Sequence, residues 1–194
     1  MRSRSRMRLE GASHSAAVAR ACSYFSPVRA FDDMTGGIEY FHFLEKTADA
    51  YSKDEKFRKE LVRKLKETAE KLFAADNLMV GYTADEEGYK ALPEELKKFK
   101  AALSDKPSRR YAFEFVPELK NEGFKTSSKV NYVARCGSFD AEAYTGALEV
   151  LKVIMNYEYL WQNLRVIGGA YGCMSNFGRS GTGCLVSYRD PKLA

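Results

Sequence analysis

An arginine and a tyrosine, Arg165 and Tyr171, stand six residues apart at the end of a long apolar segment. The guanidinium of Arg165 is a fixed cationic fork that binds carbonyl or carboxylate oxygens, and a tyrosine hydroxyl both donates and accepts hydrogen bonds. Gly168 and Gly169 lie between them, where a helical pattern gives way to a strand-like run. On either side of such a turn, the two side chains can point to one place in a cleft. That arrangement suits holding a peptide carbonyl while negative charge develops on its oxygen.

A strand, a long helix and a hairpin are the elements that would position this pair. Residues 129–136 alternate between apolar and polar side chains, which predicts a half-buried strand. Residues 141–164 form a long apolar segment that indicates a helix. After the glycine turn, residues 170–177 and 184–188 pair naturally as a hairpin around residues 179–183. This order predicts an α+β sandwich with helices packed on one face of a mainly antiparallel sheet.

The first half of the chain is expected to be mostly helical. Residues 54–74 give the clearest amphipathic stripe, with Lys and Glu on the solvated face. A second helical region covers residues 32–51 and is interrupted near Gly36 and Gly37. Residues 77–83 form a short apolar run that indicates a buried strand, and residues 85–103 return to helix, with Pro93 placed to start a second segment.

The composition indicates a soluble globular protein and narrows the classes of partner. The 194 residues are 45% hydrophobic and 29% charged, and no apolar run approaches the roughly 18 to 20 residues that span a bilayer, so no membrane partner is expected. Much of the net charge of +5 comes from arginines near the start, namely Arg2, Arg4, Arg6 and Arg8. The remainder is close to neutral, which argues against a nucleic-acid partner.

The first 29 residues have two interpretations. They are rich in Arg, Ser and Ala with Glu10 as the single acidic residue, which is typical of an organellar transit peptide. Alternatively, residues 7–24 form an amphipathic helix inside a folded domain, ended by Ser26 and Pro27. Composition does not separate the two. The folded interpretation goes with a cytoplasmic protein, and the transit peptide with an organellar matrix.

Neither the histidines nor the cysteines form a complete metal motif. The run from His42 to Lys46 is one residue away from H-x-x-E-H, and the ammonium of Lys46 cannot replace an imidazole on zinc. The four cysteines lack C-x-x-C spacing, so reduced thiols and no metal ligands are expected. Cys173 and Cys184 can face each other across the hairpin, either as a redox pair or as small core residues.

Short segments that run in order along nearly the whole chain carry a family resemblance. They are Glu10-Gly11, His14-Ser15-Ala16-Ala17, Tyr24-Phe25-Ser26-Pro27, Gly36-Gly37-Ile38, Asn77-Leu78-Met79-Val80 and residues 82–88, then Asn121-Glu122-Gly123-Phe124, Tyr132-Val133-Ala134-Arg135, Tyr144-Thr145-Gly146-Ala147-Leu148 and residues 164–191. Together they resemble the insulinase/pitrilysin family of zinc metallopeptidases, in its presequence-protease-like branch. Because the resemblance includes Glu10 and His14, it favours the folded interpretation of the start.

The resemblance implies a fragment of a larger α+β peptidase. The family has four similar domains that enclose a chamber, with the H-x-x-E-H zinc site in the first. On this basis residues 1–103 are the end of the third domain, residues 104–120 a linker, and residues 121–194 the start of the fourth. The fourth domain supplies an Arg and a Tyr that hold the substrate near the zinc, and Arg165 and Tyr171 match that pair.

The implied function is that of a zinc-dependent endopeptidase fragment that degrades short unstructured peptides. The resemblance implies a catalytic Zn²⁺ bound by a portion absent from this chain. The expected partners are a peptide substrate and either the remaining domains of the same protein or a zinc-bearing subunit. The alternative is a non-catalytic chamber half or interaction module that pairs with a separate zinc-bearing subunit.

Overall fold

The chain forms two compact units in the computed structural model, which describes residues 2–107 and 111–191. Residues 1–48 and 115–194 make up the first unit, and residues 49–114 the second. The expected domain boundaries, after residues 103 and 120, do not follow this division and stay a prediction. Residues 108–110 of the expected linker lie outside the described residues. The N-terminal helices fall in the first unit because one of them packs on the C-terminal sheet.

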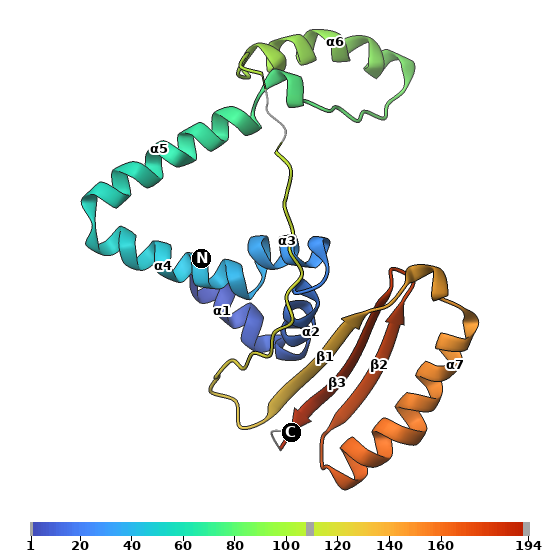
Figure 1. Ribbon diagram of the computed structural model, residues 1–194. Helices are drawn as coiled ribbons and strands as arrows, with labels where there is room; N and C mark the ends of the chain where they lie inside the picture. Colours follow the sequence, from blue (N-terminus) through green and yellow to red (C-terminus); the bar gives the residue numbers. More distant parts are fainter. Residues whose placement is uncertain (1, 108–110, 192–194) are drawn as a thin grey trace. The chain divides into compact units, whose positions relative to one another are not determined.

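The first unit is built on a three-stranded antiparallel sheet with the order β1-β3-β2 (Figure 1). Its strands are β1 (Asn131–Ser138), β2 (Gly172–Gly178) and β3 (Thr182–Asp190). The β2–β3 hairpin and the strand β1 confirm the elements predicted from alternation and turn residues. The sheet and its helices confirm the α+β class.

Helices cover opposite faces of this sheet. The helix α2 (Ser13–Ser23) packs on β1 and β3, where Cys184 and Val186 are buried together with Cys22. The helix α7 (Gly146–Ile154) and the π-helix η3 (Met155–Ile167) pack on β2. They meet the other face of the sheet. Ser175 of β2 hydrogen-bonds to Asn156 of η3 and lies opposite Leu185 of β3. Leu185 stands between Cys184 and Val186, which face α2, so its side chain and that of Ser175 point to the opposite face. The expectation of helices on one face only is therefore wrong.

The predicted long helix over residues 141–164 is divided in the structure. It consists of the short 3₁₀ turn η2 (Ala141–Ala143), then α7, then η3. The wider π-helical turn of η3 extends the element to Ile167, where the cap at Gly168 donates back to the carbonyls of Asn163 and Arg165. Residues 111–116 form no strand.

The start of the chain is helical: α1 (Arg2–Gly11) and α2 are followed by α3 (Pro27–Gly36) and α4 (Ile38–Lys53). The expected helix over residues 7–24 is divided between α1 and α2 near Ala12, and its end before Ser26 and Pro27 is confirmed. Ser26 caps α3 by accepting a hydrogen bond from the amide of Arg29, and Pro27 occupies its first turn. The predicted interruption at the glycine pair is confirmed. A Cβ on Gly37 would lie 2.2 Å from Oδ1 of Asp33, so only glycine fits there.

The second unit holds the helices α5 (Glu55–Leu72) and α6 (Glu86–Ala101) with the 3₁₀ turn η1 (Ala75–Asn77) between them. The predicted helices are confirmed, and Asp54 and Asp85 cap them. Two expectations are wrong. Pro93 lies inside a continuous α6, and residues 78–83 form no strand, with Met79 94% exposed. A short apolar run needs a partner strand, and the described residues of the second unit contain only an isolated bridge between Ala74 and Ser104. Among the described helices, none has the length and apolar character needed to cross a bilayer.

Replacing Gly181 by Ala is expected to destabilise the first unit. Gly181 has φ +76° in the hairpin turn, and a Cβ there would lie 2.3 Å from the carbonyl oxygen of Phe139. The left-handed conformation alone costs a non-glycine residue about 1–2 kcal/mol, and the clash adds to that cost. Urea denaturation measures the change in the free energy of unfolding. The matched control is Gly137→Ala on β1, where an added Cβ meets nothing within 4 Å; equal losses in both variants would contradict the argument.

Candidate functional site

The structure brings Arg165 and Tyr171 together at the helix-to-strand turn. Arg165 lies in the last turn of η3, and its Nη1 donates a hydrogen bond to the backbone carbonyl of Tyr171. The guanidinium carbon lies 4.4 Å from the ring centroid of Trp161 and 5.3 Å from that of Tyr171. Gly169, at φ +84°, allows the chain to turn between them. The predicted proximity of the two side chains is thus a feature of the fold, and their role in holding a substrate stays a prediction.

A second arginine and three aromatic residues extend this arrangement. Arg189 lies 5.7 Å from the ring centroid of Tyr171. The rings of His14, Tyr132 and Tyr188 form edge-on contacts, with Tyr188 at 5.1 Å from His14 and 5.3 Å from Tyr132, while Tyr171 lies 6.0 Å from Tyr188. We call His14, Tyr132, Tyr171 and Tyr188 the aromatic cluster.

Sequence analysis did not assign Arg189 or this cluster to the site. The alternation of residues 129–136 already placed Tyr132 on the inner face of its strand. The missing information was the register, in which Tyr132 and Gly172 both lie opposite Tyr188 on the central strand. Since pairing register is a long-range property, alternation alone could not have found it.

Exposure of the site leaves room for a ligand. Tyr171 is 62% exposed, whereas Arg165 is half-buried. Hydrogen bonds with Tyr132 and Tyr188 raise the pKa of Arg189, so this second guanidinium is firmly cationic. A tyrosine whose ring lies near two guanidinium groups can, together with them, donate hydrogen bonds to the carbonyls or the terminal carboxylate of an extended peptide.

The described residues do not supply the zinc-binding set that the family resemblance implies. His14 packs against tyrosine rings, and Nδ1 of His42 lies 3.9 Å from Glu45 with no second imidazole beside it. In the part of the chain that the structure describes, Cys22, Cys136 and Cys184 form the one group of potential metal ligands. The zinc of the implied peptidase needs two histidines and a glutamate at H-x-x-E-H spacing. The three cysteines therefore do not fit that zinc site.

Cys173 and Cys184 do not face each other. Cys173 lies opposite Ser187, and Cys184 lies opposite Asn176 on one side and Cys136 on the other. Of the two interpretations, the redox pair across the hairpin is therefore wrong, because the register of β2 and β3 places Cys173 and Cys184 on opposite faces of the sheet.

A half-buried ion network holds the helix that carries His14. Arg20 of α2 donates to Asp33 at 2.6 Å and to Glu122 at 2.8 Å. Hydrogen bonding from Arg20 lowers the pKa of Glu122 to about 2. Burial, followed by the hydrogen bond to Glu122, raises the pKa of Tyr24 to about 12. The network joins α2, α3 and the segment before β1, so it fixes α2 relative to the rest of the first unit.

The segment that carries these residues is similar to a known domain. Residues 121–194, which contain Arg165, Tyr171 and Arg189, match the PreP C-terminal domain. Over 97% of the chain, 34% of positions are identical to Protein HypA of Clostridium perfringens. Presequence protease 1, chloroplastic/mitochondrial, of Arabidopsis thaliana is 30% identical over 98% of the chain, and the mitochondrial presequence protease of Kluyveromyces lactis is 28% identical over 87%. The chain is presequence-protease-like.

This presequence-protease-like chain is much shorter than those relatives. It spans 19% of the length of Protein HypA and 18% of each of the other two. The similarity to relatives named as proteases supports membership of this chain in a peptidase family. Two of them carry chloroplastic or mitochondrial in their names.

Proposed function

We propose that the chain contributes a substrate-holding surface to a zinc-dependent, presequence-protease-like endopeptidase. The observation that carries this proposal is the contact between Arg165 and Tyr171 inside the segment that matches the PreP C-terminal domain. Tyr171 is exposed there, with a second guanidinium from Arg189 beside its ring. Short unstructured peptides are the proposed substrates, because an extended backbone offers its carbonyls to such donors.

Each residue has a distinct part in the proposed mechanism. The Tyr171 hydroxyl donates a hydrogen bond to the oxygen of the scissile carbonyl and stabilises the negative charge that develops there. Arg165 fixes the backbone of Tyr171 and adds a positive field at the same point. The zinc and the general base belong, in this proposal, to residues outside this chain, because neither His14 nor His42 has the partners that the family motif requires.

Loss of the Arg165 guanidinium is expected to weaken peptide binding. In Arg165→Gln, a charge-assisted donor is lost, which corresponds to about a tenfold or greater rise in Kd. Fluorescence anisotropy with a labelled, unstructured peptide measures this on the full chain. Arg135→Gln is the matched control, since it removes the same charge from an exposed position on β1. Equal affinity for the wild type and Arg165→Gln would contradict the proposed binding role.

A second candidate function is that of a non-catalytic interaction module, and an exposed apolar surface favours it. The outer side of α7 and η3 presents large apolar side chains that are at least half exposed. They are Val150, Val153, Ile154, Tyr157, Tyr159, Val166 and Ile167. Surfaces of this kind mark protein contacts. Co-elution with a separate zinc-bearing chain, combined with peptide affinity that does not change in Arg165→Gln, would favour this function over the first.

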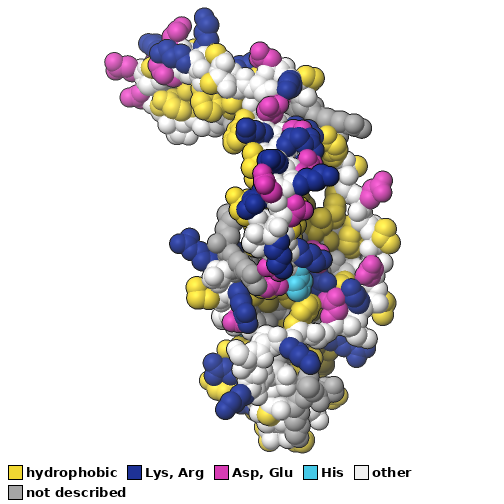
Figure 2. Space-filling view, turned by 90° about the vertical axis from the view of Figure 1, so that its left-hand side faces the viewer, with side chains coloured by type: hydrophobic (Ala, Val, Ile, Leu, Met, Phe, Trp, Pro, Cys, Tyr) yellow, Lys and Arg dark blue, Asp and Glu magenta, His cyan; other side chains and the backbone are white. Residues whose placement is uncertain are grey.

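Positive charge is mixed with negative charge on the face drawn in Figure 2, where Lys and Arg side chains intermingle with Asp and Glu side chains. A protein that follows a phosphate backbone concentrates its positive charge on one face or along one helix. The helix α1 does carry several arginines, and Arg6 among them is paired with Glu10. The contact between Arg165 and Tyr171 makes peptide recognition the function that the geometry supports best.

A further inference from the structure

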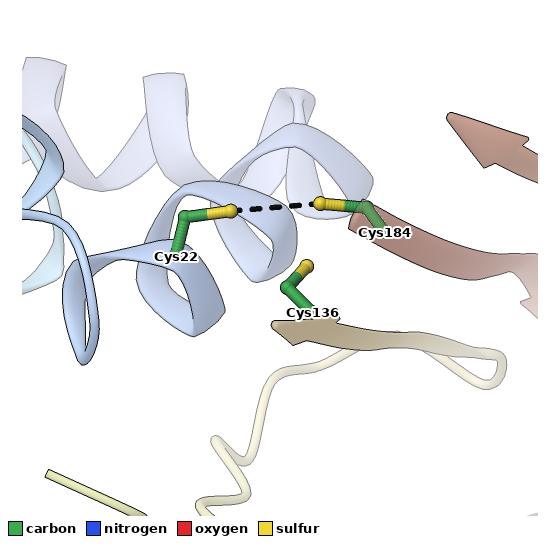
Figure 3. Close-up of side chains that lie close together, drawn as sticks. All are labelled: Cys22, Cys136 and Cys184. Atoms are coloured by element: carbon green, nitrogen blue, oxygen red, sulfur yellow. Dashed lines mark hydrogen bonds between the residues drawn. The ribbon is translucent and has the colours of Figure 1, made fainter. Parts of the chain in front are cut away.

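Three cysteines from distant parts of the sequence converge inside the first unit (Figure 3). Cys22 comes from the end of α2, Cys136 from β1 and Cys184 from β3. Their sulfur atoms all lie within 4.8 Å of one another, and the Sγ atoms of Cys22 and Cys184 are 3.5 Å apart. Cys136 and Cys184 are direct neighbours across the β1–β3 ladder. We call these residues the three-cysteine cluster.

The surroundings of the three-cysteine cluster are apolar. Val186 is buried beside it, and Val18, Phe25 and Ala134 pack against it. Cys22 and Cys184 are only 3% and 7% exposed. Space filling alone would require no sulfur at these places, because Ala or Val would serve the same core. Here three soft donor atoms point to one place from three elements.

We propose that Cys22, Cys136 and Cys184 bind one Cu(I) ion in a three-coordinate site. Thiolates select soft ions such as Cu(I), zinc or iron–sulfur clusters. Structural zinc is almost always tetrahedral with four protein ligands. Within the described residues, the potential ligand group holds three sulfurs and no fourth His, Cys, Asp or Glu, which fits Cu(I) better than zinc.

Binding involves no change of oxidation state. Each coordinating thiol releases its proton to solvent as the Cu–S bond forms, and copper remains Cu(I) throughout. The ion connects α2 to β1 and β3, and therefore joins the N-terminal helices to the segment that matches the PreP C-terminal domain. A ligand that binds only the folded state raises the stability of that state.

Anaerobic competition against a chromophoric Cu(I) chelator tests the proposal on the reduced full chain. One Cu(I) is expected to bind per molecule, with sulfur-to-copper charge-transfer absorption. Replacement of residues that merely surround a metal site costs about 10–100-fold in affinity, so Cys184→Ala and Cys136→Ala should each cost at least as much. Alanine is used because a serine hydroxyl would be buried without a partner among apolar side chains.

Cys173→Ala is the matched control, because Cys173 lies on the other face of the sheet. It should leave the affinity for Cu(I) unchanged. Cu(I) should raise the melting temperature of the wild type and of Cys173→Ala, and it should not raise that of Cys136→Ala, whose fold is checked by circular dichroism. Affinity for Cu(I) that is unchanged in Cys136→Ala and Cys184→Ala, an equal loss in Cys173→Ala, or tighter binding of Zn²⁺ than of Cu(I) would overturn the proposal.

Discussion

Replacing Tyr171 by Phe is expected to lower kcat about 100-fold or more in a peptidase assembled from this chain and a zinc-bearing portion. The substitution removes the hydroxyl and keeps the ring, so contacts with Tyr188 and the two arginines remain. Loss of one oxyanion-stabilising donor costs about 10²–10³ in kcat in enzymes where it has been measured. Because the hydroxyl is proposed to act on the developing charge, KM should change much less than kcat. Steady-state kinetics on an unstructured peptide measure both constants.

Tyr89→Phe is the matched control for this prediction. Tyr89 lies on α6, outside the domain match, and is 64% exposed. The control should turn over at the wild-type rate. If Tyr171→Phe also kept the wild-type kcat, Tyr171 would have no part in the chemical step, and the interaction-module function would become the better account.

The second large effect is expected on stability, in Arg20→Met. The side chain of Arg20 is only 14% exposed and donates to Asp33 and Glu122, whose side chains are 4% and 20% exposed. Removing one member of a buried ion pair leaves an uncompensated charge, which costs about 3–5 kcal/mol. The free energy of unfolding of the first unit should fall by that amount in urea denaturation. The comparison is a variant that breaks an exposed ion pair, such as Lys106 with Glu70. If Arg20→Met lowered the free energy of unfolding by no more than that variant, the network would contribute little to stability.

The same network predicts a dependence of stability on pH. Hydrogen bonding from Arg20 lowers the pKa of Glu122 from its ordinary 4.5 to about 2 in the folded state. A lowered pKa contributes stability that is fully present above about 4.5 and is lost as the pH falls toward 2. In Arg20→Met, this part of the acid unfolding curve should become flatter, since the largest cause of the lowered pKa is gone while Tyr24 and Lys120 remain.

Local patterns in the sequence were sufficient for several parts of this fold. The alternation over residues 129–136 predicted β1, and the glycine-rich turn predicted the β2–β3 hairpin. Arg165 and Tyr171 were expected to meet because only a glycine turn separates them, so their proximity depends on short-range geometry. The helix α5 was equally clear from its apolar stripe and from Asp54 as its cap.

Long-range contacts could not be predicted in the same way. The apolar residues 78–83 resemble a strand, and their structure depends on whether another strand lies beside them. The three-cysteine cluster joins Cys22 to Cys184, which are 162 residues apart, and no spacing rule connects such positions. The aromatic cluster likewise depends on the register of β3 against both of its neighbours. These features had to come from the three-dimensional structure.

The most direct test of the proposed function is a double-mutant cycle on Arg165 and Tyr171. Values of kcat/KM are measured for the wild-type assembly, Arg165→Gln, Tyr171→Phe and the double variant. Residues that act as one unit show coupling of about 0.5–3 kcal/mol, so the double variant should lose much less than the sum of the two single losses. Additive losses, or single variants as active as the wild type, would contradict the claim that Arg165 and Tyr171 act as one unit in holding the peptide.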